Sequence, residues 1–463
     1  MLSIIVLFPG ALAFYWSLRK GPERGFLDVY LPVLFLLPDY YRWIIPGLPD
    51  PTFSHTAVAG VFAVFVLKGF PGYRFTLFDS LIYAFAAAIF YSEFRAAGYA
   101  EAQNLLVDML GYVILPYVLT KSLIEPNGLR VVFAKRIVWL LWILAAISVY
   151  EFKFAATPFR MIFDPFFPEQ GRGWVTTFRW GFARVAGPYG HAILCGTIFV
   201  VGFRIARWLQ WSGAWEPHFK KLPNLPLSKG AIMTWGVVAG TVMSMVRGPW
   251  IGGLLGAAVV MVGKMKNRGA VVAALGAFIV FVGIPLIIQF HSYVSVGREN
   301  ALTVGQESAA YRYELIVEYG DIAMEEATWG WGRNTWPKVS GMPSIDNYYL
   351  LLFLMHGLVA TILLLTILFS MMIRLIVHGM LLPPPERAGS SLAFTLAGIY
   401  LGIIFSIATV FLGLQVMPLL FIITGWAEAY LKSGVEGLGE EAVSSAEPVA
   451  ATPRPFNFRR VVL

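Results

Sequence analysis

The stretch IMTWGVVAGTVMSMVRGPWIGGLLGAAVVMV, residues 232–262, is almost entirely apolar and carries one charged residue, Arg247. Two apolar runs, residues 231–246 and 249–264, flank this arginine, and each approaches the roughly 20 apolar residues that a membrane helix needs. An arginine at the centre of a bilayer costs about 3 kcal/mol. We therefore expect Arg247 to lie in a tight turn between two spans, or to meet an anionic partner. Because proline is favoured in the first turn of a helix, Gly248-Pro249 predicts that the second span begins there.

The composition of the whole chain supports this interpretation. Its 463 residues are 58% hydrophobic and only 13% charged, with a mean hydropathy of +0.68, whereas soluble domains have about 25% charged residues. The sequence therefore predicts an all-α, polytopic membrane protein. The net charge of +8 does not indicate nucleic-acid binding, because the basic residues are scattered between apolar runs, as in the positive-inside pattern. The single cysteine, Cys195, excludes a disulfide framework and a thiolate metal site.

Apolar runs of similar length predict about 12 to 13 spans in all. Short loops rich in Lys and Arg recur on alternate sides, which predicts an outer N-terminus and a cytoplasmic C-terminus. The predicted spans are residues 2–18, 26–41, 54–69, 76–94, 104–120, 136–151, 189–206, 231–246, 249–264, 269–290, 347–372, 391–410 and 413–431.

The predicted membrane domain comprises residues 1–432, and its two longest loops, residues 153–188 and 291–346, fall on the outer face. The second loop contains ESAAYRYELIVEYGDIAMEEA, whose spacing favours one or two amphipathic helices on the membrane surface or over a cavity. The tail, residues 433–463, is rich in Gly, Ala, Ser, Glu and Pro and is predicted to be disordered.

Three spans are predicted to begin at the same outer level. Arg184 precedes Gly187-Pro188, Arg247 precedes Gly248-Pro249, and Asp346-Asn347 is a natural N-cap pair for a third helix. A helix N-terminus favours anions, so these starts form a candidate anion site. Each residue also has a structural explanation, because either arginine can anchor a helix in the headgroup region and Asp346 can serve only as a cap.

The charges of the outer loops favour a phosphate or pyrophosphate ligand. Arginine grips such groups through paired hydrogen bonds. The chain has no GxxxxGK[ST] nucleotide cradle and no convincing metal motif, so we expect neither a metal nor a cofactor. Transfer from an activated, lipid-linked donor requires neither. The arginines of the predicted outer loops are Arg172, Arg179, Arg184, Arg247, Arg298, Arg312 and Arg333.

Four motifs in order resemble the O-antigen ligase and polymerase superfamily. They are RVAGPYGHAILCG, SMVRGPWIGG, the loop ending WGWGRN, and DNYYLLLFLMHGLVATILLL, and together they cover roughly residues 184–365. The resemblance implies an integral-membrane glycosyltransferase of the bacterial inner membrane, acting at the periplasmic face on undecaprenyl-pyrophosphate-linked glycans. Its expected partners are a glycan donor and acceptor, membrane lipids and a chain-length regulator.

The resemblance also implies roles for individual residues. Arg184 and Arg247 would hold the donor pyrophosphate, and Asp346 stands where ligases of the family typically carry a histidine as the proposed base. Because polymerases often show Asp-Asn there, the sequence leans towards polymerisation of repeat units. The candidate substrate-binding residues are Arg312, His191, Asn347, Ser244 and Arg333, and Gly330 and Gly332 match the turn that closes the loop.

Two other functions remain open. Ligation of the glycan to lipid A–core or another acceptor is the first. A flippase or transporter of lipid-linked sugar is the second, and its plausible in-span ionisable groups are Asp108 and His356. Transporters tend to show repeated halves, which this sequence lacks. A non-catalytic scaffold would leave the outer arginines unexplained.

Overall fold

The computed structural model describes residues 2–44, 46–168, 170, 176–219, 226–265, 267–342, 344–382, 391–413 and 415–433. In this part of the chain a helical segment lies over each of the predicted spans. Seven helical stretches are long and apolar enough to cross a membrane, and Phe53–Leu67 and Leu392–Ile407 are shorter apolar helices. The protein is thus an all-α, membrane-spanning chain. The predicted tail lies outside the described residues, except for Ser433.

The first half of the chain forms the following helices: α1 (Leu7–Lys20, after the turn η1, Leu2–Val6), α2 (Pro22–Gly25), η2 (Phe26–Tyr30), α3 (Leu31–Leu36), α4 (Phe53–Leu67), α5 (Leu77–Ala97), α6 (Tyr99–Met109), η3 (Leu110–Ile114), α7 (Leu115–Leu123), α8 (Arg130–Phe154), α9 (Pro158–Phe163), η4 (Asp164–Phe166) and η5 (Gly187–Tyr189). The second half forms α10 (Ala192–Trp211), α11 (Lys229–Met243), α12 (Arg247–Lys264), α13 (Arg268–Phe278), η6 (Ile279–Gly283), α14 (Ile284–Val294), η7 (Arg298–Asn300), α15 (Val304–Glu325), α16 (Tyr348–Leu381), α17 (Leu392–Ile407) and α18 (Val416–Ser433).

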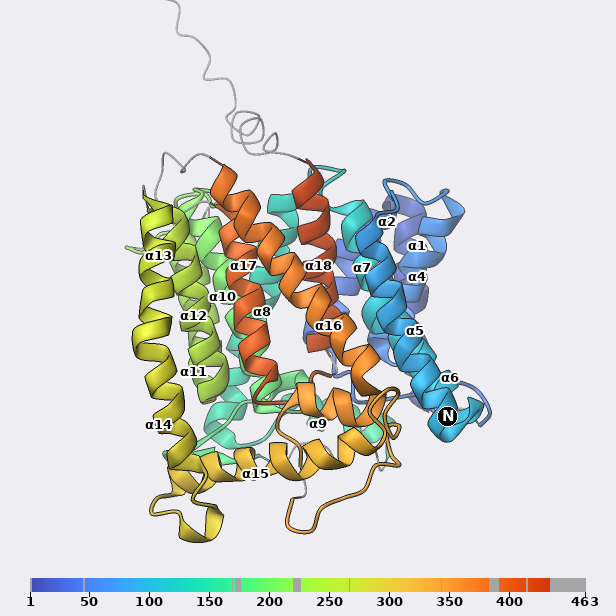
Figure 1. The fold of residues 1–463 in the computed structure, drawn as a ribbon. Coiled ribbons are helices and arrows are strands. Elements are labelled where there is room, and N and C mark those ends of the chain that lie inside the picture. The colour runs from blue at the N-terminus through green and yellow to red at the C-terminus, as the bar shows by residue number, and fades with distance from the viewer. Residues whose placement is uncertain are drawn as a thin grey trace, which may run out of the picture.

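The long helices stand side by side, and α15 lies across one end of the bundle (Figure 1). We call this end, where α9 and the loop after α15 also lie, the loop end. The N-terminus is at the loop end, and α18 ends at the opposite end (Figure 1). The prediction that the N- and C-termini of the membrane domain lie on opposite sides is therefore consistent with the helix arrangement.

Helices α12 and α17 pack with almost no side chain between their backbones. A Cβ atom built on Gly256 would lie 2.3 Å from the carbonyl oxygen of Gly398, and one built on Gly252 would lie 2.7 Å from that of Gly402. The two pairs are four residues apart on each helix, a spacing that brings small residues to one face and lets membrane helices approach closely. This contact fixes α12, and with it Arg247, against α17.

Several predicted boundaries are wrong in detail. The helix after Arg184 begins at Ala192 with His191 as N-cap, because Gly187–Tyr189 forms a separate 3-10 turn. Arg247 is itself the first residue of α12, so it does not precede the helix. The amphipathic segment forms a single 22-residue helix, α15, which is one of the two arrangements predicted for it.

Helix α16 is interrupted at Gly357, which has φ 74° and ψ −176° inside an otherwise apolar helix. Residues of the preceding loop fill the gap: Trp331 N and Gly332 N donate to the carbonyls of Leu354 and Met355, at 2.9 and 2.8 Å, and Leu358 N donates to Ala327 O at 2.7 Å. The loop thus supplies the backbone partners that a continuous helix would supply itself.

Candidate functional site

A small β-hairpin carries two of the loop-end arginines. Strand β1 (Phe178–Arg179) pairs with β2 (Phe182–Ala183), and the backbone of Arg184 continues the pairing through a 2.9 Å bond to Thr177 O. The hairpin is attached to the turn between α11 and α12. Val185 N donates to Met243 O at 3.2 Å, and the Arg179 guanidinium donates to Met245 O. Two residues after Met245, α12 begins with Arg247.

The attachment of the hairpin to the turn before α12 places these cations in one region of the molecule. Burial, followed by the charge of Arg247, lowers the pKa of Arg179, and burial with the charge of Arg179 lowers that of Arg184. Burial and the charge of Arg184 lower the pKa of His191 to about 4. We call Arg179, Arg184, Arg247 and His191 the arginine cluster.

Two members of this cluster, Arg179 and Arg247, have no carboxylate partner among the described residues. Among the described residues, no ion pair involves Arg179 or Arg247. The buried Glu151 approaches the hairpin, but its two oxygens accept from Ala186 N and Gly187 N at 3.0 Å each. Because adjacent cations repel, this arrangement favours an anion that contacts several of them.

Ser244 does not line this cluster. It is fully buried at the end of α11, and its hydroxyl donates to Thr241 O at 2.7 Å. A Cβ atom on Gly196 of α10 would lie 2.9 Å from its Oγ. The side chain thus closes the turn against α10, and the substrate-binding role of Ser244 stays a prediction.

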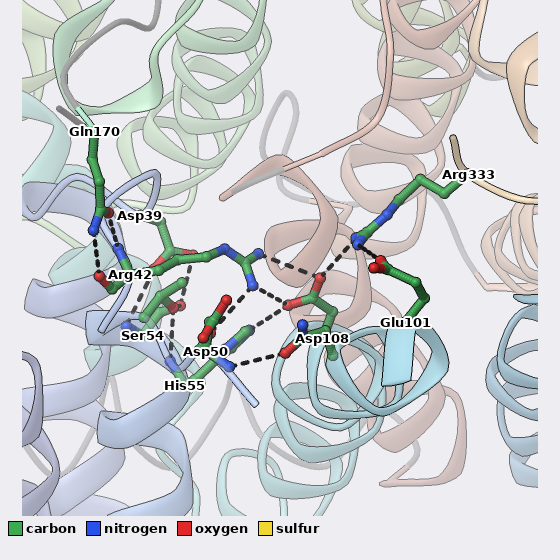
Figure 2. Close-up of polar contacts among 11 residues, drawn as sticks. Asp39, Arg42, Asp50, Ser54, His55, Glu101, Asp108, Gln170 and Arg333 are labelled. Carbon is green, nitrogen blue, oxygen red and sulfur yellow. Dashed lines mark hydrogen bonds and ion pairs between the residues drawn. The ribbon is translucent and has the colours of Figure 1, made fainter. Parts of the chain in front are cut away.

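A second group of charged side chains lies around Asp108 at the junction of α6 and η3 (Figure 2). Arg42 Nη1 and Nη2 donate to the Asp108 oxygens at 3.0 and 3.3 Å. Arg333 Nη1 lies 3.7 Å from Asp108 Oδ2, and Nη2 lies 4.0 Å from Glu101. His55 Nε2 approaches Asp108 Oδ1 from another side, at 3.7 Å. Burial alone would lower the pKa of Arg42, but Asp108 outweighs it, so the pKa is raised.

Backbone contacts hold Arg42 in place although it lies between helices. Gln170 bridges its backbone, accepting from Arg42 N and donating to Arg42 O at 2.9 Å each. The Arg42 guanidinium also donates to Asp50 O at 3.2 Å, and an isolated β-bridge joins Arg42 to Thr52. Arg333 is fixed by the loop that fills the gap in α16, and its backbone N–H donates to Glu93 at 2.8 Å.

Asp108, Arg42 and Arg333 line a cavity of about 300 Å³, which we call the Asp108 cavity. His356 also lines it, and its Nδ1 lies 3.1 Å from Ser92 Oγ. Most of the remaining wall is apolar or aromatic, formed by residues that include Ile89, Leu105, Met109, Tyr112, Tyr348, Leu351, Met355, Phe411, Leu412 and Met417.

The segment between α17 and α18, residues 408–413, separates the arginine cluster from the Asp108 cavity. On one side, Thr409 packs against Gly248, where an added Cβ atom would lie 2.5 Å from Thr409 Oγ1. Phe411 lines the cavity on the other side, and its ring meets the His191 ring edge-on with centroids 6.0 Å apart. The two sites are therefore neighbours.

The other predicted site residues are distributed around the loop end. Asn347 is the N-cap of α16, as predicted, and its Oδ1 accepts from Tyr349 N and Leu350 N at 3.0 and 3.3 Å. Asp346 accepts from Ser344 Oγ at 3.3 Å and lies two residues before Tyr348, which lines the Asp108 cavity. Arg312 is exposed on α15 and lines a different cavity of about 310 Å³, between α14 and α15.

The sequence named Arg333 as a candidate substrate-binding residue, and the structure pairs it with Asp108 and Glu101. Sequence reasoning missed Arg42 altogether. Asp108 and His356 were recognised only as in-span ionisable groups, and both line the cavity. No local pattern joins Arg42 to a carboxylate 66 residues later.

Comparison with models of known protein families gives no match, and a search of curated proteins finds no relative of this chain. Within the described residues, no group of three or more His, Cys, Asp or Glu side chains is arranged to hold a metal ion. The function therefore has to be argued from the two sites at the loop end.

Proposed function

We propose that this protein is an integral-membrane glycosyltransferase that polymerises undecaprenyl-pyrophosphate-linked repeat units, with its loop end facing the periplasm of a bacterial inner membrane. The arginine cluster holds the pyrophosphate of the donor lipid. The ordered resemblance to O-antigen ligases and polymerases supports this proposal, and so does the position of the cluster at one end of the apolar bundle, where a lipid-anchored pyrophosphate would lie.

The observation that carries the proposal is the attachment of the hairpin to the turn before α12, which brings Arg179 and Arg184 close to the helix start at Arg247. Like charges held together by a hairpin and a helix start are costly unless an anion joins them. A pyrophosphate presents several oxygens to several guanidiniums, and paired hydrogen bonds to arginine are strong. Because α12 begins at Arg247, the positive end of its helix dipole lies in the same region.

The proposed reaction needs one base and a stabilised leaving group. A hydroxyl oxygen of the acceptor attacks C1 of the donor sugar, the bond from C1 to the pyrophosphate oxygen breaks, and the hydroxyl proton passes to the base. Asp346 is the proposed base, since a carboxylate can take that proton. The arginines stabilise the negative charge that develops on the departing pyrophosphate.

The variant Arg247→Lys tests the role of the cluster. It keeps the positive charge but loses the forked geometry, so we expect polymer formation by purified protein in proteoliposomes to fall at least about tenfold. The matched control is Arg136→Lys, at the opposite end of the bundle, where the arginine pairs with Asp28. Polymer assembly at the native rate by Arg247→Lys would remove the pyrophosphate role.

Ligation uses the same donor and differs only in the acceptor. In the proteoliposome assay a polymerase lengthens the lipid-linked glycan itself, whereas a ligase transfers the glycan to added lipid A–core without lengthening it. The Asp-Asn pair, Asp346-Asn347, favours the polymerase.

One observation favours a function of another class, a flippase or transporter of lipid-linked sugar. Asp108 and His356, the in-span ionisable groups, line the same cavity, as buried ionisable residues of transporters often do. Movement of a fluorescent lipid-linked sugar across liposomes by the purified protein, without chain growth, would favour this function over glycosyl transfer.

A further inference from the structure

We infer that the Asp108 cavity is a binding site for a neutral sugar ring, adjacent to the pyrophosphate site. This inference rests on the proposed glycosyl transfer, because it assigns the sugar of the lipid-linked substrate to a particular set of residues. Three features of the cavity carry it: its mixture of donors and acceptors, its apolar and aromatic wall, and its position beside the arginine cluster.

The charged groups of the cavity form a set of donors and acceptors that is incompletely paired. Arg42 takes up one side of Asp108 with two hydrogen bonds, but Arg333 remains 3.7 Å from the same carboxylate, beyond direct hydrogen-bond distance (Figure 2). Arg333 Nε is buried without a hydrogen-bond partner among the described residues. Adjacent sugar hydroxyls both donate and accept, so they can bond to Arg333 and to Asp108 at the same time.

The same charges disfavour an anionic ligand in this cavity. Asp108 faces the cavity with only 8% of its side chain exposed, and Glu101 approaches Arg333 to 4.0 Å. A phosphate would meet these carboxylates at short range, whereas the arginine cluster next to the cavity has two cations without an ion pair. The arginine cluster therefore suits the anionic part of the ligand, and the Asp108 cavity suits the neutral part.

The wall of the cavity suits the C–H faces of a sugar ring. Tyr112, Tyr348 and Phe411 contribute aromatic surface, and Leu351 contributes an aliphatic side chain. A volume of about 300 Å³ lies at the lower end of the range for small-molecule sites, roughly 300–1,000 Å³, so the cavity suits a small ring better than a long chain. A few polar groups in an apolar pocket are the usual arrangement for fixing a ligand's orientation.

The position of the cavity links it to the pyrophosphate. Phe411 touches the His191 ring on one side and lines the cavity on the other. A sugar bonded to a pyrophosphate in the arginine cluster would therefore extend past Phe411 into the cavity. The terminal sugar of an acceptor has the same chemistry, and the experiment below separates these two sources.

The test measures binding of methyl glycosides of glucose, galactose and N-acetylglucosamine to the purified protein in nanodiscs, by saturation-transfer NMR. We expect at least one of them to bind the wild type. Asp108→Asn should weaken that binding at least about tenfold, as expected when hydrogen bonds to a charged group are lost. Asp321→Asn, an exposed aspartate of α15, is the matched control and should bind like the wild type.

A second variant covers the case in which Asp108→Asn fails to fold. Leu351→Trp fills the cavity with apolar bulk and leaves the ion pairs intact, so it should also abolish sugar binding. Normal glycoside binding by both cavity variants would overturn the inference. So would the absence of binding to the wild type, or displacement of the glycoside by inorganic phosphate in the Arg247→Lys variant.

The same samples distinguish this inference from the proposed function. Arg247→Lys should weaken binding of inorganic pyrophosphate and leave methyl glycoside binding unchanged. If pyrophosphate binding is insensitive to Arg247→Lys while glycoside binding depends on Asp108, the pyrophosphate role fails and the sugar site stands. The 1-phosphates of the same sugars identify the source: weaker binding in Arg247→Lys indicates the donor sugar, and unchanged binding indicates the acceptor.

Discussion

His191 caps α10 through its Nδ1, which accepts from Ile193 N at 3.2 Å, while Arg184 opposes its protonation. An unfolded histidine titrates near pH 6.5, and in the folded protein the pKa is about 4. Between these two values the unfolded chain binds a proton that the folded chain does not. The free energy of unfolding therefore falls as the pH drops from about 6.5 to 4, and this contribution is absent above pH 6.5.

The variant His191→Asn removes this titration and keeps an N-capping side chain. We expect its apparent Tm in detergent to fall less than that of the wild type between pH 6.5 and pH 4. His218→Asn, which replaces an exposed histidine in the connection between α10 and α11, is the control and should follow the wild-type curve. Identical pH profiles for His191→Asn and the wild type would contradict the lowered pKa of His191, which burial and the charge of Arg184 produce.

The sequence predicts single residues well where a local rule applies. The preference of proline for the first turn of a helix predicts a helix start beside Arg247, and the preference of Asn for the N-cap position predicts a cap at Asn347. Both predictions are close to what the structure shows. The sequence does not give the partners of Ser244 and Arg333, because these come from other helices: Ser244 packs on α10, and Arg333 reaches Asp108. Side-chain environments of that kind depend on tertiary packing, which no local pattern encodes.

Among the elements, the contact between α12 and α17 is sensitive to a single added side chain. In Gly256→Leu the new Cβ atom would meet the backbone carbonyl of Gly398, which cannot move without separating the helices. We expect a loss of stability of roughly 1–3 kcal/mol, as for overpacking elsewhere, seen as a lower apparent Tm in detergent. Gly276→Leu on the exposed face of α13, where nothing lies within 4 Å, is the control and should have little effect.

The sequence indicates the small residues of α12 and α17 but not that these two helices pair. It does not predict the break in α16, because FLMHGLVAT lies inside a single predicted span, residues 347–372. The break depends on hydrogen bonds from residues about thirty positions earlier, which replace those of a regular helix. Hydropathy therefore predicts that a helix forms at α16. Whether that helix is continuous depends on the loop before it, which hydropathy does not describe.

For the whole molecule, the arrangement of the helices predicts which residues face the same side of the membrane. Cys195 is the single cysteine and is buried, so Cys195→Ala gives a cysteine-free background. In intact cells, a membrane-impermeant thiol reagent should label Glu318→Cys on α15 but not Lys68→Cys after α4, both of which replace exposed residues. Permeabilised cells should be labelled at both positions. Labelling of Lys68→Cys alone in intact cells would invert the proposed orientation.

The gap in α16 has a consequence for how the protein is made. Ala327 and Thr328 are synthesised before α16, yet their carbonyls accept the amides of Leu358 and Val359 inside it, at 2.7 and 3.4 Å. These two bonds can form only after the segment around Ala327 and Thr328 has packed against α16, so a nascent chain ending before residue 358 lacks both of them.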